Sequence, residues 1–349
     1  MALTFKSDDL LSFGIHLFEA KKVPATVARR VSDSLVSTSL AGIDSHGVIL
    51  FIRYIDEIEN GQIVPDAEPE IVTDSGPVSL IDGHFGFGQV TAMKGMALAI
   101  DKASSHGIAA VGFRHTNHIG RVGEYTLQAA RKNLIALGSC NAGANVAPYG
   151  ASRRLFGTNP LCCAIPVRDR DPILIDLATS ILPEGKIRVA KNEKRKIKPG
   201  ILIDREGKPT DIPADLYLGG AILPIGEHKG SALSLMVEVL CGLMTGTGCA
   251  AFSDWPGGNG VLFIVIDPSR FRNLNEFFDD IDKMIGAIKG LPTAPGCDEI
   301  LLPGDPEYHM ENERKKNGIP LDDETWQGLQ AIAERLGVAT PEPLNDARG

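Results

Sequence analysis

IDGHFGFGQVTAMKGMALAI, residues 81–100, decides which kind of α/β fold this chain adopts. The stretch has the pattern of a strand, a glycine turn and a helix, which is the context of a dinucleotide-binding fingerprint. The fingerprint G-x-G-x-x-G fails here, because Gly86 and Gly88 are followed by Thr91 where the third glycine belongs. The acidic residue expected about twenty residues later is also missing, since residues 104–106 are Ser-Ser-His. An ordinary Rossmann site is therefore disfavoured, and the glycines are expected to let a helix pack closely against its neighbours.

Strand and helix patterns alternate on both sides of this stretch, which indicates an α/β body. Segments with a strand pattern occur at residues 70–76, 78–83, 108–115, 134–140, 160–166, 173–179 and 261–267. Helical patterns occur at residues 89–107, 120–133, 228–246 and 269–290. Both chain ends are helical as well, with three helices predicted over 7–61 and two more over 307–318 and 322–337. We expect these terminal helices to pack together as one layer.

The composition limits the classes of partner. With 35 Lys and Arg against 44 Asp and Glu, the formal net charge is −9, which disfavours nucleic acid and anionic membrane surfaces. No apolar run approaches the roughly 18 residues of a membrane span. The six cysteines form no C-x-x-C pair, so we expect buried free thiols in a reducing compartment and a cytoplasmic location.

Two polar clusters far apart in the sequence carry histidines. GIDSHGVIL, residues 42–50, joins two predicted helices, and Asp44 is well placed to cap the second of them. RHTNHIGRVGEY, residues 114–125, lies where a predicted strand meets a predicted helix. We expect the imidazoles of His46 and His118 to converge on one pocket.

The second cluster has more than one interpretation. His115 and His118 sit three residues apart, but a metal site needs three or four ligands and no Cys or carboxylate partner is close in sequence. Arg121 stands near the expected start of a helix, where its guanidinium and the helix dipole suit a carboxylate. A capped loop histidine and a surface arginine remain the open alternative.

Two further positions indicate polar contacts inside apolar segments. Asp176 interrupts an apolar run of strand length, so its carboxylate should be hydrogen-bonded, either to Thr179 or to a backbone amide. Lys229 and Gly230 stand at the start of a nearly all-apolar helix, where a cation opposes the helix dipole. An anion bound between the lysine and the helix would remove that conflict.

Seven motifs, in this order, resemble the malate/L-lactate dehydrogenase family of NAD(P)-dependent oxidoreductases. They are GIDSHGV, NHIGRVGEY, GTNPLCCAIP, DLATS with GKIRVA, GEHKGSALSLMVEVLCG, GNGVLFIVIDP and LLPGDPE. The resemblance implies an α/β fold of the L-sulfolactate dehydrogenase type, in which a mixed-sheet domain over residues 71–299 binds NAD or NADP without a Rossmann fingerprint. It also implies a helical domain made of residues 1–70 plus 300–349, and an intertwined homodimer.

The resemblance also implies roles for single residues. Ser45, His46 and His118 are expected beside the substrate, with His118 preferred as the acid/base although either histidine can serve as proton donor. Asn117 and Arg121 are expected substrate contacts, and no metal is implied. Cofactor contacts are implied for Asp176, Leu177, Ala178, Lys186, Lys229, Gly230, Gly304, Asp305 and Pro306.

One position departs from the family pattern. Many members carry an arginine three residues after the DSHG glycine, where it binds the substrate carboxylate, and this chain has Leu50 there. Either Arg121 takes over that contact or the substrate has no carboxylate at that end. The identity of the substrate and the choice between NAD and NADP therefore stay open.

Three classes of function compete. The leading hypothesis is hydride transfer between NAD(P)H and a small 2-oxo or 2-hydroxy acid, or a cyclic imino acid, with a histidine exchanging the proton. The second is a metal-dependent hydrolase that uses the histidines. The third is a non-catalytic binding protein that kept the fold.

Overall fold

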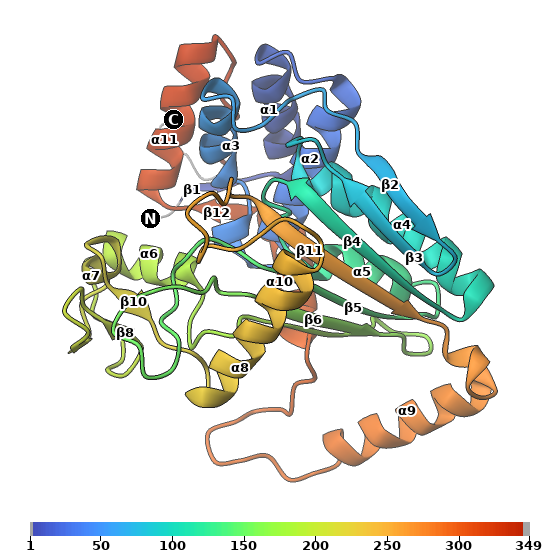
Figure 1. Cartoon of the computed structure of the whole chain (residues 1–349). Coiled ribbons are helices and arrows are strands. Elements are labelled where there is room, and N and C mark those ends of the chain that lie inside the picture. The colour runs from blue at the N-terminus through green and yellow to red at the C-terminus, as the bar shows by residue number, and fades with distance from the viewer. Residues whose placement is uncertain (1–2, 345–349) are drawn as a thin grey trace.

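The computed structural model describes residues 3–344, and within them a large mixed sheet lies beside a layer of helices from both chain ends (Figure 1). Seven strands form this sheet, in the order β2 (Glu70–Ser75), β3 (Val78–Asp82), β4 (Ile108–Thr116), β11 (Asn259–Ile266), β5 (Ile135–Cys140), β6 (Leu161–Ile165) and β7 (Ile173–Leu177). Strands β3 and β4 pair in parallel, and the other neighbours pair antiparallel. The predicted α/β fold with a mixed sheet is confirmed.

The remaining elements surround this sheet. The α-helices are α1 (Ser7–Ala20), α2 (Ala25–Leu40), α3 (Leu50–Glu59), α4 (Gly88–His106), α5 (Gly123–Ala130), α6 (Glu184–Asn192), α7 (Ala214–Tyr217), α8 (His228–Val237), α9 (Leu274–Lys289), α10 (Asp305–Asn317) and α11 (Asp323–Leu336). Short strands outside the sheet are β1 (Leu3–Phe5), β8 (Leu202–Ile203), β9 (Pro209–Thr210), β10 (Ala221–Ile222) and β12 (Ile319–Leu321). Short helical segments are the 3-10 turns η1 (Asp44–His46) and η3 (Pro268–Arg270) and the π-helix η2 (Glu238–Leu243).

Strand β11 contributes to two cores, because successive residues of a strand face opposite sides of the sheet. Val261, Phe263 and Val265 belong to the core shared with α4 and α5. Leu262 and Ile264 belong to the core shared with α8 and η2. A strand buried on both faces has a continuous apolar sequence, which explains why VLFIVID was recognisable without alternation.

The terminal helices α1, α2, α3 and α11 enclose a separate core (Figure 1). Within it the rings of Phe18 and Phe51 meet edge to face with their centroids 5.7 Å apart. The ring centroids of Phe5 and Trp326 are 4.5 Å apart. Strand β1 pairs with β12, so the two ends of the chain are hydrogen-bonded to each other. The three helices predicted over 7–61 are confirmed, whereas the β1–β12 pairing was not predicted. The domain limits 1–70 plus 300–349 and 71–299 stay a prediction.

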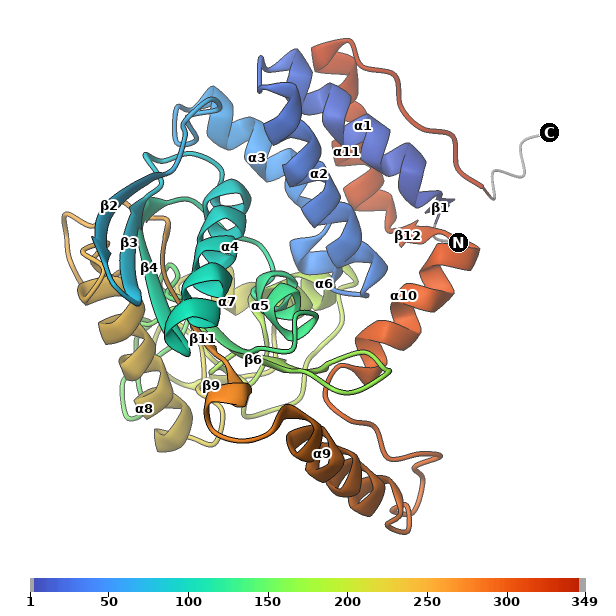
Figure 2. The same cartoon turned by 90° about the vertical axis from the view of Figure 1, so that its right-hand side faces the viewer.

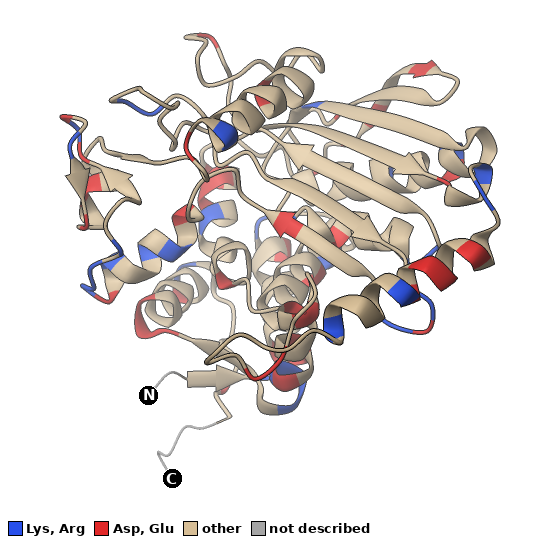
Figure 3. Ribbon diagram, turned by 90° about the horizontal axis from the view of Figure 1, so that it is seen from below, with Lys and Arg blue, Asp and Glu red and all other residues tan. Residues whose placement is uncertain are grey.

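Helix α9 extends away from the body of the molecule (Figure 2). Its Ile281, Ile285 and Ile288 pack near Val167 and Ile173 at the edge of the sheet. Acidic and basic residues recur along the ribbon of this helix, whereas most of the sheet carries neither (Figure 3). Among the residues that the structure describes, no helix combines the length and the apolarity needed to cross a membrane.

A buried carboxylate marks the point where α8 changes into η2. The sequence predicted one continuous helix over 228–246, but the backbone takes π-helical hydrogen bonds from Glu238. The Glu238 residue is 4% exposed and accepts hydrogen bonds from the side-chain amides of Asn141 at 3.0 Å and Asn159 at 2.9 Å. Asn141 also accepts from the amide of Gly260 at 2.8 Å, so this network joins η2 to β5 and β11.

Replacing Asn141 by alanine is expected to lower the free energy of unfolding by about 3 kcal/mol or more. Glu238, the Gly260 amide and the Gly248 carbonyl each lose a buried partner, and each orphaned group costs about 1 kcal/mol or more. Urea unfolding followed by circular dichroism measures the loss. Asn275→Ala, at an exposed position of α9, is the matched control, and a surface change of this kind stays within about 0.5 kcal/mol. A similar value for both variants would contradict the prediction.

Candidate functional site

The DSHG tetrapeptide forms a single 3-10 turn, η1, between α2 and α3. The prediction that Asp44 caps α3 is wrong, because α3 begins at Leu50 and has no side-chain cap. The Asp44 carboxylate instead binds the guanidinium of Arg314 in α10, which also donates to the carbonyl oxygen of Ser39. A bidentate guanidinium–carboxylate contact is stronger than the single hydrogen bond to a backbone amide that a helix cap would provide. The turn is thereby attached to a helix from the other end of the chain.

The turn brings His46 to His118. Their ring centroids are 5.5 Å apart and the ring planes are inclined by 30°, so the expected convergence of the two imidazoles is confirmed, and it occurs within one chain. The hydroxyl of Ser45 lies 2.9 Å from Nδ1 of His46. This contact leaves Nε2 of His46 available for another partner.

A buried chain of polar side chains orients His118. The hydroxyl oxygen of Tyr54 in α3 lies 2.7 Å from Nδ1 of His118, and it accepts a hydrogen bond of 2.7 Å from Nε2 of Gln89 in α4. The tyrosine oxygen can accept from the amide and from Nδ1–H of the imidazole at the same time. Nδ1 is thus engaged with Tyr54, and Nε2 is the nitrogen left free for a ligand.

The surrounding protein lowers the pKa of both imidazoles. The pKa of His46 falls from its usual 6.5 to about 4, first through burial and then through the nearby guanidinium of Arg188. The pKa of His118 falls well below 6.5, again first through burial, with Arg53 and His46 acting in the same direction. Both residues keep some contact with solvent. The two rings are therefore neutral at pH 7, and a proton on one of them opposes a proton on the other.

Gly88 allows the loop that carries His118 to lie directly against α4. A Cβ atom at Gly88 would stand 2.3 Å from the carbonyl oxygen of Asn117 and 2.4 Å from that of His118. The close helix packing expected of the glycine stretch is thus confirmed. The side-chain amide of Asn117 donates to the carbonyls of Phe85 at 2.6 Å and Gln62 at 3.0 Å. Its expected contact with substrate stays a prediction.

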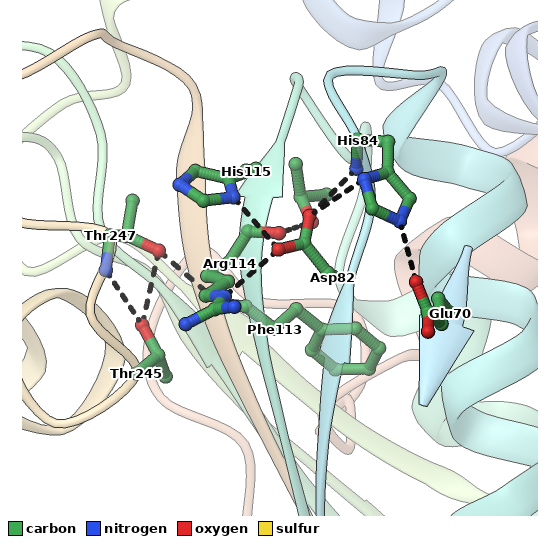
Figure 4. Close-up of polar contacts among 9 residues, drawn as sticks. Glu70, Asp82, His84, Phe113, Arg114, His115, Thr245 and Thr247 are labelled. Atoms are coloured by element: carbon green, nitrogen blue, oxygen red, sulfur yellow. Dashed lines mark hydrogen bonds and ion pairs between the residues drawn. The ribbon is translucent and has the colours of Figure 1, made fainter. Parts of the chain in front are cut away.

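The neighbouring histidine, His115 near the end of β4, belongs to a different polar cluster, shown in Figure 4. Nδ1 of His115 and Nε of Arg114 each lie 2.9 Å from one oxygen of Asp82, and the His84 amide donates to the other oxygen at 3.0 Å. Burial acts to raise the pKa of the Asp82 carboxyl, but these hydrogen bonds together hold it below its usual value. His115 and His118 therefore do not act as a pair. In residues 3–344, no three His, Cys, Asp or Glu side chains converge as metal ligands.

Arg121 and Asp176 meet at the start of α5. The Gly123 amide donates to the Asp176 carboxylate at 3.0 Å, which confirms the backbone-amide interpretation of that aspartate. The strand is exposed at Asp176, yet crowding by protein raises the pKa of its carboxyl to about 6 while Arg121 opposes the rise. Nε and Nη1 of Arg121 are buried without a hydrogen-bond partner in the described part of the chain. The cations that act on the two imidazoles are Arg53 and Arg188, so a substrate contact by Arg121 stays a prediction.

The segments implied as cofactor contacts lie along strand β7, at the edge of the sheet. At one end the Leu174 amide donates to the carbonyl of Pro303 at 2.9 Å, which places the 304–306 turn there. At the other end Gly230 lies so close that a Cβ atom on it would stand 2.7 Å from the carbonyl oxygen of Thr179. From Leu174 to Thr179 the extended chain spans about 17 Å. This path is exposed at Asp176 and Leu177 and buried at Leu174 and Thr179, so its middle is open to an elongated ligand.

Two lysines, one in α6 and one in α8, also suit an anionic dinucleotide. Lys186 and Lys229 are both exposed, which makes them available for phosphate oxygens. The carboxylate of Asp305 already contacts Lys289 at 2.8 Å and Arg170 at 3.1 Å, so the turn offers its backbone rather than that side chain. These residues fit the cofactor in extent and in charge, while their individual contacts with it stay predictions.

Four side chains around the imidazoles escaped prediction, namely Tyr54, Gln89, Arg53 and Arg188. Tyr54 follows Leu50 at helical spacing, so it was indistinguishable from a core residue. Gln89 is the first polar residue after the glycine turn. Its place between a strand and a helix was the one available signal.

A sequence profile of the malate/L-lactate dehydrogenase family matches residues 5–330. The chain belongs to this family. Malate dehydrogenase from Pyrococcus horikoshii is 36% identical over 342 residues, which cover 95% of each chain. The solved sulfolactate dehydrogenase from Methanocaldococcus jannaschii has a TM-score of 0.87 at 33% identity, covering 97% of this chain and 98% of that one. The solved Δ1-piperideine-2-carboxylate reductase from Pseudomonas syringae has a TM-score of 0.85 at 31% identity, covering 95% and 99%.

These comparisons confirm the family resemblance and the fold of the L-sulfolactate dehydrogenase type. Membership in a family of hydroxy acid dehydrogenases makes the protein an oxidoreductase. The substrate and the cofactor of this chain are matters for proposal.

Proposed function

We propose that the protein transfers a hydride between NAD(P)H and C2 of a small 2-oxo or 2-hydroxy acid. The observation that carries this proposal is the meeting of His46 and His118 at 5.5 Å, with Arg53 and Arg188 close enough to depress their pKa values. In a 2-oxo acid the carbonyl oxygen needs a group that exchanges a proton, which an imidazole provides. The neighbouring carboxylate needs a cation, which a guanidinium provides.

In this proposal His118 exchanges the proton with the substrate oxygen at C2. Tyr54 holds Nδ1 of His118, so the exchange takes place at Nε2. On reduction of a 2-oxo acid the imidazolium gives its proton to the oxygen that becomes the hydroxyl, and on oxidation the neutral ring takes the proton back. His46, held by Ser45, offers its own Nε2 as a second hydrogen-bonding group to the same oxygen.

The substrate's charge supports this exchange. The free site holds neutral imidazoles near two guanidinium groups, and this arrangement disfavours a further positive charge. A bound carboxylate neutralises part of that field, so the pKa of His118 rises when the acid binds. The proton donor is therefore charged most readily when a substrate is present to use it.

When bound, the nicotinamide would supply the hydride and fix which face of the substrate carbon is attacked. The groups proposed to hold the dinucleotide are the exposed end of β7 at Asp176, Leu177 and Ala178, the lysines Lys186 and Lys229, and the backbone at Gly230 and at the 304–306 turn. In this proposal the protein itself orients the substrate, balances the charge of its carboxylate and exchanges the proton with its oxygen at C2.

The test is a panel of 2-oxo acids and one cyclic imino acid, Δ1-piperideine-2-carboxylate, assayed with NADH and with NADPH. Turnover of a 2-oxo acid with either cofactor would support the proposal. Turnover of the cyclic imine alone would favour the alternative that the fold similarity to the piperideine-2-carboxylate reductase suggests. Tight cofactor binding without turnover of any member would point to a non-catalytic binding protein.

The pH dependence should differ in sign between the two directions. Oxidation of the hydroxy acid needs neutral His118, so its kcat/KM should stay level from about pH 6.5 to about pH 8.5. Reduction of the oxo acid needs the protonated ring, whose pKa in the free protein lies well below 6.5. Its kcat/KM should therefore fall about tenfold for each unit of pH across the same range. A level profile for reduction would contradict the role of His118.

We also propose that the protein acts as a homodimer. Five apolar side chains of α8, η2 and the residue after it are each more than 40% exposed in the single chain: Leu235, Met236, Val239, Leu243 and Met244. Apolar surface gathered in this way marks a protein–protein interface. Light scattering after size-exclusion chromatography should report twice the mass of the chain, and a monomer at micromolar concentration would refute this part of the proposal.

A further inference from the structure

A groove runs along the outer face of α3, next to the DSHG turn. Its volume is about 440 Å³. The residues that line it are Ile49, Leu50, Ile52, Arg53, Asp56, Glu57, Asn60, Gln62 and Arg188. All of them except Arg188 belong to residues 49–62, which are α3 and the residues next to it. Helix α6 contributes one cation, Arg188, to this lining.

Helix α6 brings this cation to the groove by packing on the DSHG turn. A Cβ atom at Gly185 would stand 1.9 Å from Cβ of Ser45, so only glycine permits the contact. Arg188 follows three residues later, on the same side of the helix, and its Nη2 lies 3.5 Å from the carbonyl oxygen of Ser45. The guanidinium is therefore held beside the residue that precedes His46.

The other charges of the groove are paired more closely than that of Arg188. Nε of Arg53 lies 2.6 Å from Glu57, and Asp56 lies 3.3 Å from Arg335 outside the groove. The carboxylate nearest to Arg188 is that of Glu184, 3.9 Å away, and Glu184 already accepts a hydrogen bond of 2.5 Å from Tyr217. A guanidinium has five N–H donors, and those of Arg188 are mostly unused within the described residues.

We propose that Arg188 binds the substrate carboxylate and that the substrate is a 2-oxo or 2-hydroxy monocarboxylate with an apolar side chain. The guanidinium of Arg188, loosely paired with Glu184 at 3.9 Å, can bind one carboxylate, and a second anionic group would face Asp56 and Glu57. The apolar side chains of Ile49, Leu50 and Ile52 line the rest of the groove and suit an alkyl substituent. This inference rests on the proposed function, because it assigns the substrate contact of the same site.

The experiment compares Arg188→Gln with Arg188→Lys and with the control Arg195→Gln, whose guanidinium is exposed and pairs with the nearby carboxylate of Glu193. With 2-oxobutanoate, Arg188→Gln should raise KM by about 10- to 100-fold, the scale of a lost charge-assisted contact, with a smaller effect on kcat. Arg188→Lys should recover part of the loss, and added guanidinium ion should lower KM for Arg188→Gln alone. The wild-type protein should prefer 2-oxobutanoate to the dianion oxaloacetate.

Binding of oxamate, an unreactive monocarboxylate, is measured by calorimetry in the presence of the reduced cofactor and separates the two proposals. If Arg188→Gln binds oxamate more weakly but the wild type turns over no substrate, the carboxylate contact of Arg188 is supported and the proposed function is refuted. Wild-type turnover with equal oxamate binding in both proteins would refute Arg188 and leave the function intact. Failure of the wild type to bind oxamate, or a preference for oxaloacetate, would overturn the inference. Thermal melting of each variant verifies that it is folded.

Discussion

Replacing His118 by alanine is expected to lower kcat by about two to four orders of magnitude, the usual cost of losing a positioned acid or base. The imidazole is oriented at Nδ1 by Tyr54 and lies 5.5 Å from His46, so neither a water molecule nor His46 can occupy the same position with the same orientation. The measurement is steady-state turnover of the best 2-oxo acid from the panel. The pH dependence of reduction should weaken at the same time, because the group that titrates is gone.

The matched control is His16→Ala, which removes an exposed imidazole from α1 and should leave kcat unchanged. His118→Asn tests the same role while keeping a polar side chain of similar reach, and it should be as inactive as the alanine variant. A loss of less than about threefold in both His118 variants would clear this residue of acid/base catalysis. A loss of about two to four orders of magnitude in His46→Ala, with both His118 variants active, would assign the acid/base role to His46.

Replacing Gly185 by alanine is expected to lower kcat/KM by about 100-fold, although Gly185 makes no contact with substrate. The new Cβ atom would stand 1.9 Å from Cβ of Ser45, so either α6 or the DSHG turn must move by more than 1 Å. Displacements of about 1 Å in a catalytic group cost on the order of 100-fold in rate. Both Arg188 and His46 are affected, since one follows the glycine in α6 and the other follows Ser45.

Gly286→Ala is the control for this prediction, because Gly286 lies within helix α9 and an added Cβ there meets no atom within 4 Å. That change should leave kcat/KM untouched and raise stability slightly, as alanine favours helix over glycine by about 1 kcal/mol. Thermal melting distinguishes a local shift from unfolding. A Gly185→Ala protein with normal kcat/KM would show that the α6 contact does not position the site.

Most of the secondary structure could be predicted because its signals are local. The apolar run 261–267 indicates a strand by itself, and the helical spacing over 7–61 indicates three helices. The glycines of 81–100 correctly indicated close packing rather than a Rossmann site. Local signals failed where a distant residue competed for a side chain. Asp44 has the form of a helix cap, but Arg314, 270 residues later, binds it instead. Glu238 was hidden in an apolar helix because its amide partners, Asn141 and Asn159, come from other segments.

The sequence by itself determined the α/β class, the family and the two histidine motifs, because periodicity and motif order are properties of neighbouring residues. The tertiary structure alone decided which of those side chains meet. It separated His115 from His118, joined His118 to Tyr54 and Gln89, and placed Arg188 beside the DSHG turn. The physical reason is that these meetings join segments far apart in the sequence, such as α3 with α4 through Tyr54 and Gln89, and α6 with the DSHG turn through Gly185. Hydrophobic burial brings such segments together only when the whole chain is folded.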